Sequence, residues 1–390
     1  MRANFIEDEL EDLRKRGLTR SLRQIESPQG PRIAIQGREV LNLSSNNYLG
    51  LADHRSVKEA AIACLRRYGT GAGASRLVSG DMAPHRELES QIARFKGSEA
   101  ALLFNSGYHA NLALITTLVG RGDVIFSDRL NHASLIDGAI LSRATVKRYA
   151  HGDVEALERQ FEAHRHCRRR LIVTDGLFSM DGDIAPLREI QRLARRYDSM
   201  VIVDDAHGTG TLGRHGRGTL EHLGMDADDI IQMGTLGKAL GSFGGFVAAG
   251  QRLIDLCVNK ARAFVFTTAL PPAVCAASSA ALAIIEGEPE LIAALAERAA
   301  FMRKALNEAG CDTLSSAHHI IPIMVGDPVR AATVSDQLLR EGLYIQAIRP
   351  PTVPEGTSRL RLTVMANHSL DDLRSAALII KNTVGHAGAA

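Results

Sequence analysis

The chain has 390 residues, enough for two domains, and its 45% apolar and 23% charged residues are typical of a folded globular protein. With 46 basic and 44 acidic residues, the net charge of +2 gives no reason to propose a nucleic-acid partner. Five cysteines, an odd number without a C-x-x-C pair, indicate neither a disulfide framework nor a metal site. No segment resembles a secretory signal or reaches transmembrane length, so we expect no membrane partner and a cytoplasmic location.

The first fifty residues are predicted to form an N-terminal arm, and short apolar runs then alternate with helical patterns. The predicted strands are residues 101–104, 124–127, 171–175, 200–205, 230–233 and 245–250. Helical patterns occupy residues 86–95 and 185–197 among them, and residues 272–287 after them. Continuous apolar runs of this length are typical of strands buried on both faces, so we expect an α/β fold with a mostly parallel central sheet.

The pattern changes near residue 290. A strong amphipathic helix is predicted over residues 291–310, followed by strands at 320–326 and 360–364 with a helix between them. We therefore expect three parts: an arm (1–50), a large cofactor-binding domain (51–289) and a smaller C-terminal α+β domain (290–390).

Polar residues stand at the ends of the predicted strands. They are Thr174, Asp175 and Ser179 after one strand, Asp204 and His207 after the next, and Thr235 and Lys238 after a third. In an open α/β sheet, ligands bind outside the carboxyl ends of the strands, so these side chains should meet at one edge. Gly107 opens an apolar helix after residue 104, where backbone N–H groups can face a phosphate.

Two glycine-rich segments invite a nucleotide interpretation, which their context disfavours. Residues 208–213 match G-x-G-x-x-G, but no amphipathic helix follows them. Residues 232–245 contain a Gly-Lys pair, but Gln232 and Ala239 break the P-loop pattern. Five glycines surround Lys238 in that second segment, which suggests a close approach to a flat ligand; whether each glycine is required stays open.

An amine, a carboxylate and a helix N-terminus together are what pyridoxal 5'-phosphate (PLP) requires. The lysine forms a Schiff base with the aldehyde, and the carboxylate keeps the ring nitrogen protonated. Each residue alone has a simpler interpretation, with Asp204 as a turn cap and Lys238 as a surface lysine. The combination favours PLP.

Six segments resemble the α-oxoamine synthases, a family of fold-type I PLP-dependent transferases. They are residues 42–51, 71–80, 131–138, 174–183, 204–210 and 234–241. The resemblance implies condensation of a small amino acid with an acyl thioester and loss of CO2. Residues 17–23 and 348–363 are most similar to the member that joins L-alanine to a pimeloyl thioester in biotin synthesis. A glycine-specific member that uses acetyl-CoA, another α-oxoamine synthase and a cofactor-binding protein without turnover remain alternatives. The acyl carrier, CoA or acyl carrier protein, stays open.

The resemblance also implies roles for individual residues. Lys238 would carry the cofactor and act as base, Asp204 would pair with the ring nitrogen, and His132 would stack on the ring. His207 and Ser179 would lie near the phenolic oxygen. The phosphate contacts would be Gly107, Tyr108, Thr235 and Thr267. Thr267 and Ser75 would serve the partner subunit's site, which implies a homodimer with shared active sites. Arg349 would bind the alanine carboxylate, and Arg20 and Thr352 would contact substrate.

Overall fold

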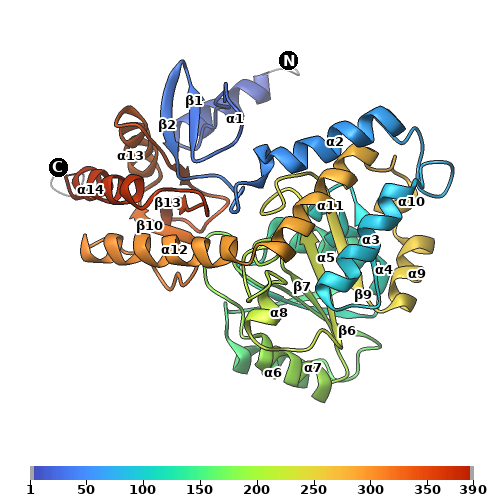
Figure 1. The fold of residues 1–390 in the computed structure, drawn as a ribbon. Coiled ribbons are helices and arrows are strands. Elements are labelled where there is room, and N and C mark those ends of the chain that lie inside the picture. Colours follow the sequence, from blue (N-terminus) through green and yellow to red (C-terminus); the bar gives the residue numbers. More distant parts are fainter. Residues whose placement is uncertain (1–3, 387–390) are drawn as a thin grey trace. The chain divides into compact units, whose positions relative to one another are not determined.

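The computed structural model describes residues 4–386, which divide into two compact units (Figure 1). The large unit comprises Leu51–Ser179 and Ile184–Ala293. The small unit comprises residues 4–50, Met180–Asp183 and residues 294–386. The ends of the expected arm and C-terminal domain, residues 1–3 and 387–390, lie outside the described residues. Over residues 4–386, no helix has the length and apolarity needed to cross a bilayer.

A seven-stranded sheet forms the centre of the large unit, in the order β3-β9-β8-β7-β6-β4-β5. The strands are β3 (Ala100–Phe104), β4 (Val124–Asp128), β5 (Thr145–Tyr149), β6 (Arg170–Asp175), β7 (Met200–Asp204), β8 (Ile230–Thr235) and β9 (Gly245–Ala249). Strands β5, β4, β6, β7 and β8 run parallel, whereas β9 is antiparallel to both of its neighbours. The mostly parallel α/β sheet expected from the sequence is confirmed.

Helices cover both faces of this sheet. The helices of the large unit are α2 (Arg55–Tyr68), α3 (Ala83–Lys96), α4 (Gly107–Leu118), α5 (Ala133–Ser142), α6 (Val154–Ala163), α7 (Leu187–Arg196), α8 (Thr219–His222), α9 (Gln251–Lys260), α10 (Arg262–Val265) and α11 (Pro272–Gly287), with a 3-10 turn at Leu51–Asp53. Side chains of α4, α5, α9 and α10 form one apolar core with the sheet, and those of α6, α7 and α8 form the other. Burial on both faces explains why these strands are continuous apolar runs.

The small unit contains two three-stranded sheets. One has the order β1-β2-β11 and the other β10-β13-β12. Its strands are β1 (Arg32–Ile35), β2 (Arg38–Asn42), β10 (Ile320–Gly326), β11 (Leu343–Tyr344), β12 (Gln346–Ile348) and β13 (Ser358–Thr363). Its helices are α1 (Asn4–Lys15), α13 (Pro328–Arg340) and α14 (Leu370–His386), and the boundary between the units falls within α12 (Glu290–Glu308).

Strand β5 was not expected from the sequence. Its residues, TVKRY, include only two apolar side chains, and the first four are exposed or half-buried. The strand therefore lacks the continuous apolar run by which the sequence identifies buried strands, including β3 at the other edge of the sheet.

Candidate active site

The carboxyl edge of the large sheet gathers the polar residues that follow its strands. Asp175 ends β6 and Asp204 ends β7, and the two residues pair across the strands. Thr235 ends β8, the next parallel strand. Parallel strands that share this register bring the three side chains to one edge, as the sequence predicts.

Asp204 is buried and hydrogen-bonded. Its Oδ2 accepts from Asn111 Nδ2 at 2.7 Å, and its Oδ1 accepts from the Ala206 N–H at 3.0 Å. The bond from the Ala206 N–H is the local turn cap that the simpler interpretation assigned to Asp204. The bond from Asn111 comes from a helix 93 positions earlier in the sequence and is not part of a turn.

Lys238 and His207 come together from two separate loops. Lys238 Nζ lies 2.8 Å from His207 Nε2, although 31 residues separate them in the sequence. His207 lies in the turn after β7, where Asp205 accepts hydrogen bonds from Thr209 and Thr219 and pairs with the buried Lys96. Residues 208–213 therefore form a turn closed on Asp205, and their match to a dinucleotide motif is accidental.

His132 precedes α5 and caps it. Its Nδ1 accepts from the Ser134 N–H at 3.3 Å, and its own N–H donates to Asp175 Oδ2 at 2.8 Å. Burial lowers the pKa of His132, and the positive charge of Lys238 acts in the same direction, against the opposing effect of Asp204. A neutral imidazole suits a ring that lies flat against an aromatic ligand.

Asp175 is buried next to Asp204 on the adjacent strand. Complete burial and the neighbouring Asp204 raise the pKa of Asp175 well above its usual range, despite the His132 N–H bond. Burial beside a second carboxylate thus favours the protonated form of Asp175.

The N-terminus of α4 lies beside Thr235. Ser106 caps this helix by accepting from the His109 N–H. A Cβ placed on Gly107 would lie 3.4 Å from Met233 Sδ and 3.8 Å from Thr235 Cβ, so the helix N-terminus and Thr235 are neighbours. The helix dipole and the N-terminal N–H groups favour a phosphate here. Tyr108, the second residue of α4, donates its hydroxyl to Asp137 of α5.

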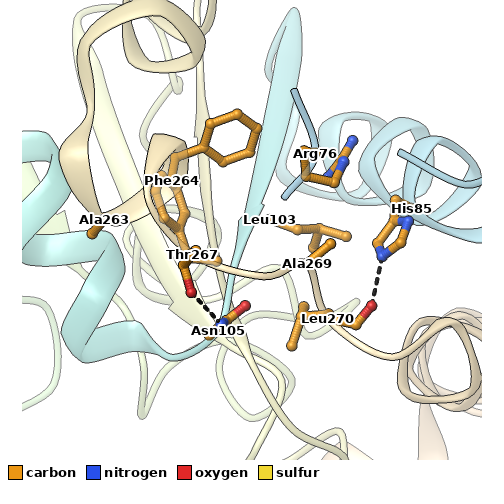
Figure 2. A pocket seen from close by; sticks show the side chains of 10 residues that line it. Arg76, His85, Leu103, Asn105, Ala263, Phe264, Thr267, Ala269 and Leu270 are labelled. Atoms are coloured by element: carbon orange, nitrogen blue, oxygen red, sulfur yellow. Dashed lines mark hydrogen bonds between the residues drawn. The ribbon is translucent and has the colours of Figure 1, made fainter. Parts of the chain in front are cut away.

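Thr267 lies beside the residues that lead into α4. Figure 2 shows Asn105 Nδ2 directed at Thr267 Oγ1, a bond of 2.9 Å, in a pocket also lined by Arg76 and Phe264. Ser75 lies in the adjoining turn, which is tied to this segment by the Ala269 N–H bond to the Ala74 carbonyl at 3.0 Å. Ser75 and Thr267 thus belong to neighbouring surface segments of one chain.

The expected substrate arginines lie in the small unit. A cavity of about 670 Å³ is lined there by Arg20, Arg349 and Thr352 among other residues. Arg20 Nη2 donates to Thr352 Oγ1 at 3.4 Å, and Arg349 donates to the carbonyls of Gly17 and Thr19 at 2.5 and 2.9 Å. Burial and the adjacent Arg20 lower the pKa of Arg349, as expected where two cations share a site suited to an anion.

The large unit therefore brings together the amine, the carboxylate, the imidazoles and the helix N-terminus that were expected around PLP. Ser179 lies in the turn after β6, four residues beyond Asp175. Sequence reasoning missed Asn111 and Ser134. The sequence signal for Asn111 was a single asparagine among the mostly apolar residues of α4, four residues after Gly107.

Comparison with known proteins places this site in a family. Residues 38–380 match the family model of class I and II aminotransferases. The chain is 57% identical over 374 residues to an 8-amino-7-oxononanoate synthase of Geobacter sulfurreducens, covering 95% of each chain.

Solved structures agree with this relationship. A serine palmitoyltransferase from S. paucimobilis with bound PLP has a TM-score of 0.92 at 30% identity, covering 99% of this chain and 98% of its own. An 8-amino-7-oxononanoate synthase from Francisella tularensis has a TM-score of 0.78 at 27% identity, covering 89% and 98%. The chain thus belongs to the class I and II aminotransferase family and, within it, to the α-oxoamine synthases, most closely resembling 8-amino-7-oxononanoate synthase.

Proposed function

We propose that the protein is a PLP-dependent acyltransferase that condenses L-alanine with a pimeloyl thioester. The products are 8-amino-7-oxononanoate, CO2 and the free thiol carrier, a step of biotin biosynthesis. The structural observation that carries this proposal is Lys238 Nζ at 2.8 Å from His207 Nε2, on the sheet edge where Asp204 ends β7. Full-length identity of 57% to a curated synthase of this reaction supports the choice of substrates.

The residues of the large unit fit PLP by their chemistry. Lys238 would hold the aldehyde carbon, Asp204 the ring nitrogen, and the start of α4 with Thr235 the phosphate. When bound, PLP supplies an aldehyde that captures the amino acid and a ring that accepts the electron pair of the broken bond. His132, kept neutral by burial, would lie against the ring face, and His207 and Ser179 would contact the phenolic oxygen.

Lys238 has the second task of moving a proton. Its Nζ would act as the base that removes the α-proton of L-alanine. The adjacent His207 Nε2 orients this amine through the 2.8 Å contact. The α-carbon would form its bond to the thioester carbonyl as the thiol leaves. The former alanine carboxylate would then depart as CO2, and a proton would return to the α-carbon. The net reaction therefore balances as alanine plus thioester giving amino ketone, CO2 and thiol.

Three further residues are proposed as substrate contacts. Arg349 is proposed to bind the alanine carboxylate, because it is partly buried and has guanidinium N–H groups beyond the two that bond Gly17 and Thr19. Arg20 and Thr352 are bonded to each other along the same cavity and are proposed as further substrate contacts.

We also propose a homodimer with shared active sites in a reducing, cytoplasmic location. All five cysteines are free thiols, which fits that location. An apolar patch on the large unit supports a dimer: Leu77, Val78, Phe243 and Phe266 are 52%, 80%, 57% and 72% exposed. Their segments adjoin, because Ala269 bonds Ala74 and a Cβ on Gly244 would lie 3.1 Å from Leu270. Thr267 and Ser75 lie on the same segments and would reach the partner's phosphate.

A substrate-pair assay tests the function. Thiol release is measured with L-alanine or glycine against pimeloyl or acetyl thioesters, each carried on CoA or on acyl carrier protein. We expect L-alanine with a pimeloyl thioester to react at least about tenfold faster than the other pairs, since a misfitting substrate loses 1–3 kcal/mol of binding per misplaced group. Lys238→Ala should remove both turnover and the visible absorbance of the Schiff base between Lys238 and PLP.

Two results would redirect the assignment. Faster reaction of glycine with acetyl-CoA would identify the glycine-specific relative instead. A protein that binds PLP but releases no thiol from any pair would favour a cofactor-binding protein without turnover.

A further inference from the structure

A chain of buried hydrogen bonds connects two residues of the candidate site, Asp204 and His132. Asn111 of α4 is fully buried, and Ser134 of α5 is 1% exposed. Asn111 Nδ2 lies 2.7 Å from Asp204 Oδ2 and 2.8 Å from Ser134 Oγ. Ser134 Oγ in turn lies 2.8 Å from His132 Nδ1. Asp204 ends β7 and His132 precedes α5, so these contacts join two separate segments through residues of α4 and α5.

The chemical groups of these side chains determine which atom donates and which accepts in each hydrogen bond. A carboxylate only accepts, so the Asn111 group facing Asp204 must be the NH2, and its second hydrogen serves Ser134 Oγ. Because Ser134 Oγ accepts from Asn111, its own hydrogen is available to His132 Nδ1. Nδ1 also accepts from the Ser134 N–H at 3.3 Å, so the imidazole proton resides on Nε2.

A reversed amide would break this arrangement. It would direct Asn111 Oδ1 at Asp204 and Ser134 and leave Asp204 without a side-chain donor among residues 4–386. In the observed orientation Oδ1 is the atom without a protein partner over the same residues. An orphan carbonyl oxygen is less costly than an unpaired carboxylate.

We propose that Asn111 is a positioning residue for the reaction: it orients the Asp204 carboxylate and, through Ser134, sets the tautomer of the His132 ring. The inference rests on the proposed function, because Asp204 and His132 act on bound PLP. Asn111 itself does not touch the cofactor in this scheme. It would act on PLP indirectly, through Asp204 and His132.

The expected loss of PLP affinity follows from the type of hydrogen bond that Asn111 makes. Hydrogen bonds to charged groups contribute about 1.5–3 kcal/mol, which corresponds to a change of about 10- to 150-fold in an equilibrium constant. Asn111→Ala should therefore weaken PLP binding by about tenfold or more and shift the visible band of the bound cofactor. Asn111→Asp should weaken it further, because it sets a second carboxylate against Asp204.

The experiment measures PLP affinity and the absorbance spectrum of the full-length protein for these variants, alone and combined with Asp204→Asn. If Asn111 acts through Asp204, Asn111→Ala should change PLP affinity by less than about twofold in the Asp204→Asn background. Thr117→Val is the matched control: Thr117 is buried on the same helix, and its hydroxyl has no bond within the described chain. This control should leave affinity and spectrum unchanged.

The possible results distinguish failure of the Asn111 positioning role from failure of the proposed function. Wild-type affinity and spectrum in Asn111→Ala, or equal losses with and without the Asp204 carboxylate, would overturn the positioning role while leaving the function standing. A wild-type protein that binds no PLP would overturn both. If Asn111→Ala fails to fold, Ser134→Ala tests the second link, and it should change the spectrum while the affinity loss stays smaller than for Asp204→Asn.

Discussion

Two buried histidines show how single residues are held in one protonation state. His132 at the candidate site and His368 in the small unit are both kept neutral by burial. His368 uses both ring nitrogens in this form: Nδ1 accepts from the Met365 N–H at 3.0 Å, and Nε2 donates to the Asn42 carbonyl at 3.2 Å. Burial lowers the pKa of His368 to about 4. A second proton would displace the Met365 N–H from Nδ1.

His368 should therefore make stability depend on pH. Its folded pKa lies below the unfolded value of about 6.5, so its contribution is complete above that value and is lost as pH falls toward 4. At 1.36 kcal/mol per tenfold change, the free energy of unfolding should be about 3 kcal/mol lower at pH 4 than at pH 8 from this residue alone.

Denaturant unfolding of wild type and His368→Asn across this pH range checks the prediction. The asparagine can still accept from Met365 but cannot be charged, so the variant's curve should be flatter in acid. His166→Asn, at an exposed position, is the control and should leave the slope as it is. Equal slopes for wild type and His368→Asn would contradict the prediction.

At the level of elements, the glycines around Lys238 have different tasks. A Cβ on Gly245, the first residue of β9, would lie 2.5 Å from the Gly107 nitrogen at the start of α4. A Cβ on Gly237 would meet nothing closer than the Ser242 carbonyl oxygen at 3.6 Å. Close approach of two backbones thus requires glycine at 245, while glycine at 237 is only tolerated.

Alanine substitutions at the two positions should diverge. Gly245→Ala should lower the free energy of unfolding by about 1–3 kcal/mol and weaken PLP binding, because it displaces the N-terminus of α4. Gly237→Ala should be neutral or stabilising by up to about 1 kcal/mol, since it restricts the unfolded chain. Thermal unfolding and PLP titration of both variants provide the comparison, and a similar loss in both would refute it.

At the scale of the whole molecule, we expect the exposed apolar patch of the large unit to be buried in the proposed dimer interface. Val78 and Phe266 are the most exposed of its four residues. A charge placed in a buried interface must be desolvated without a partner, so Val78→Asp should shift the assembly toward single chains. The shared-site arrangement predicts that PLP affinity falls together with the dimer.

Light scattering or sedimentation of Val78→Asp, with PLP titration on the same samples, checks this expectation. Leu378→Asp is the matched control, because Leu378 is 60% exposed on α14 of the small unit. A wild type that sediments as a single chain, or a Val78→Asp variant that stays dimeric, would refute the proposed interface.

The amino-acid sequence by itself determined the alternation of strands and helices, because strands buried on both faces must be apolar throughout. It also determined the chemical groups at the strand ends, where Asp204, His207 and Lys238 follow apolar runs. Strand β5 was missed because only two of its five residues are apolar and four of them are exposed or half-buried. The family resemblance assigned roles that no pattern of apolar residues could have distinguished.

Only the tertiary structure decided which of these groups meet. Lys238 contacts His207 because β7 and β8 are neighbours in the sheet, and strand order is not encoded in any local pattern. Asn111 reaches Asp204 because α4 packs on the sheet with its buried side beneath the strand ends. A lone asparagine in an apolar helix looks the same in the sequence whether it faces water or a carboxylate. The raised pKa of Asp175 likewise follows from burial and from the proximity of Asp204, which arise only on folding.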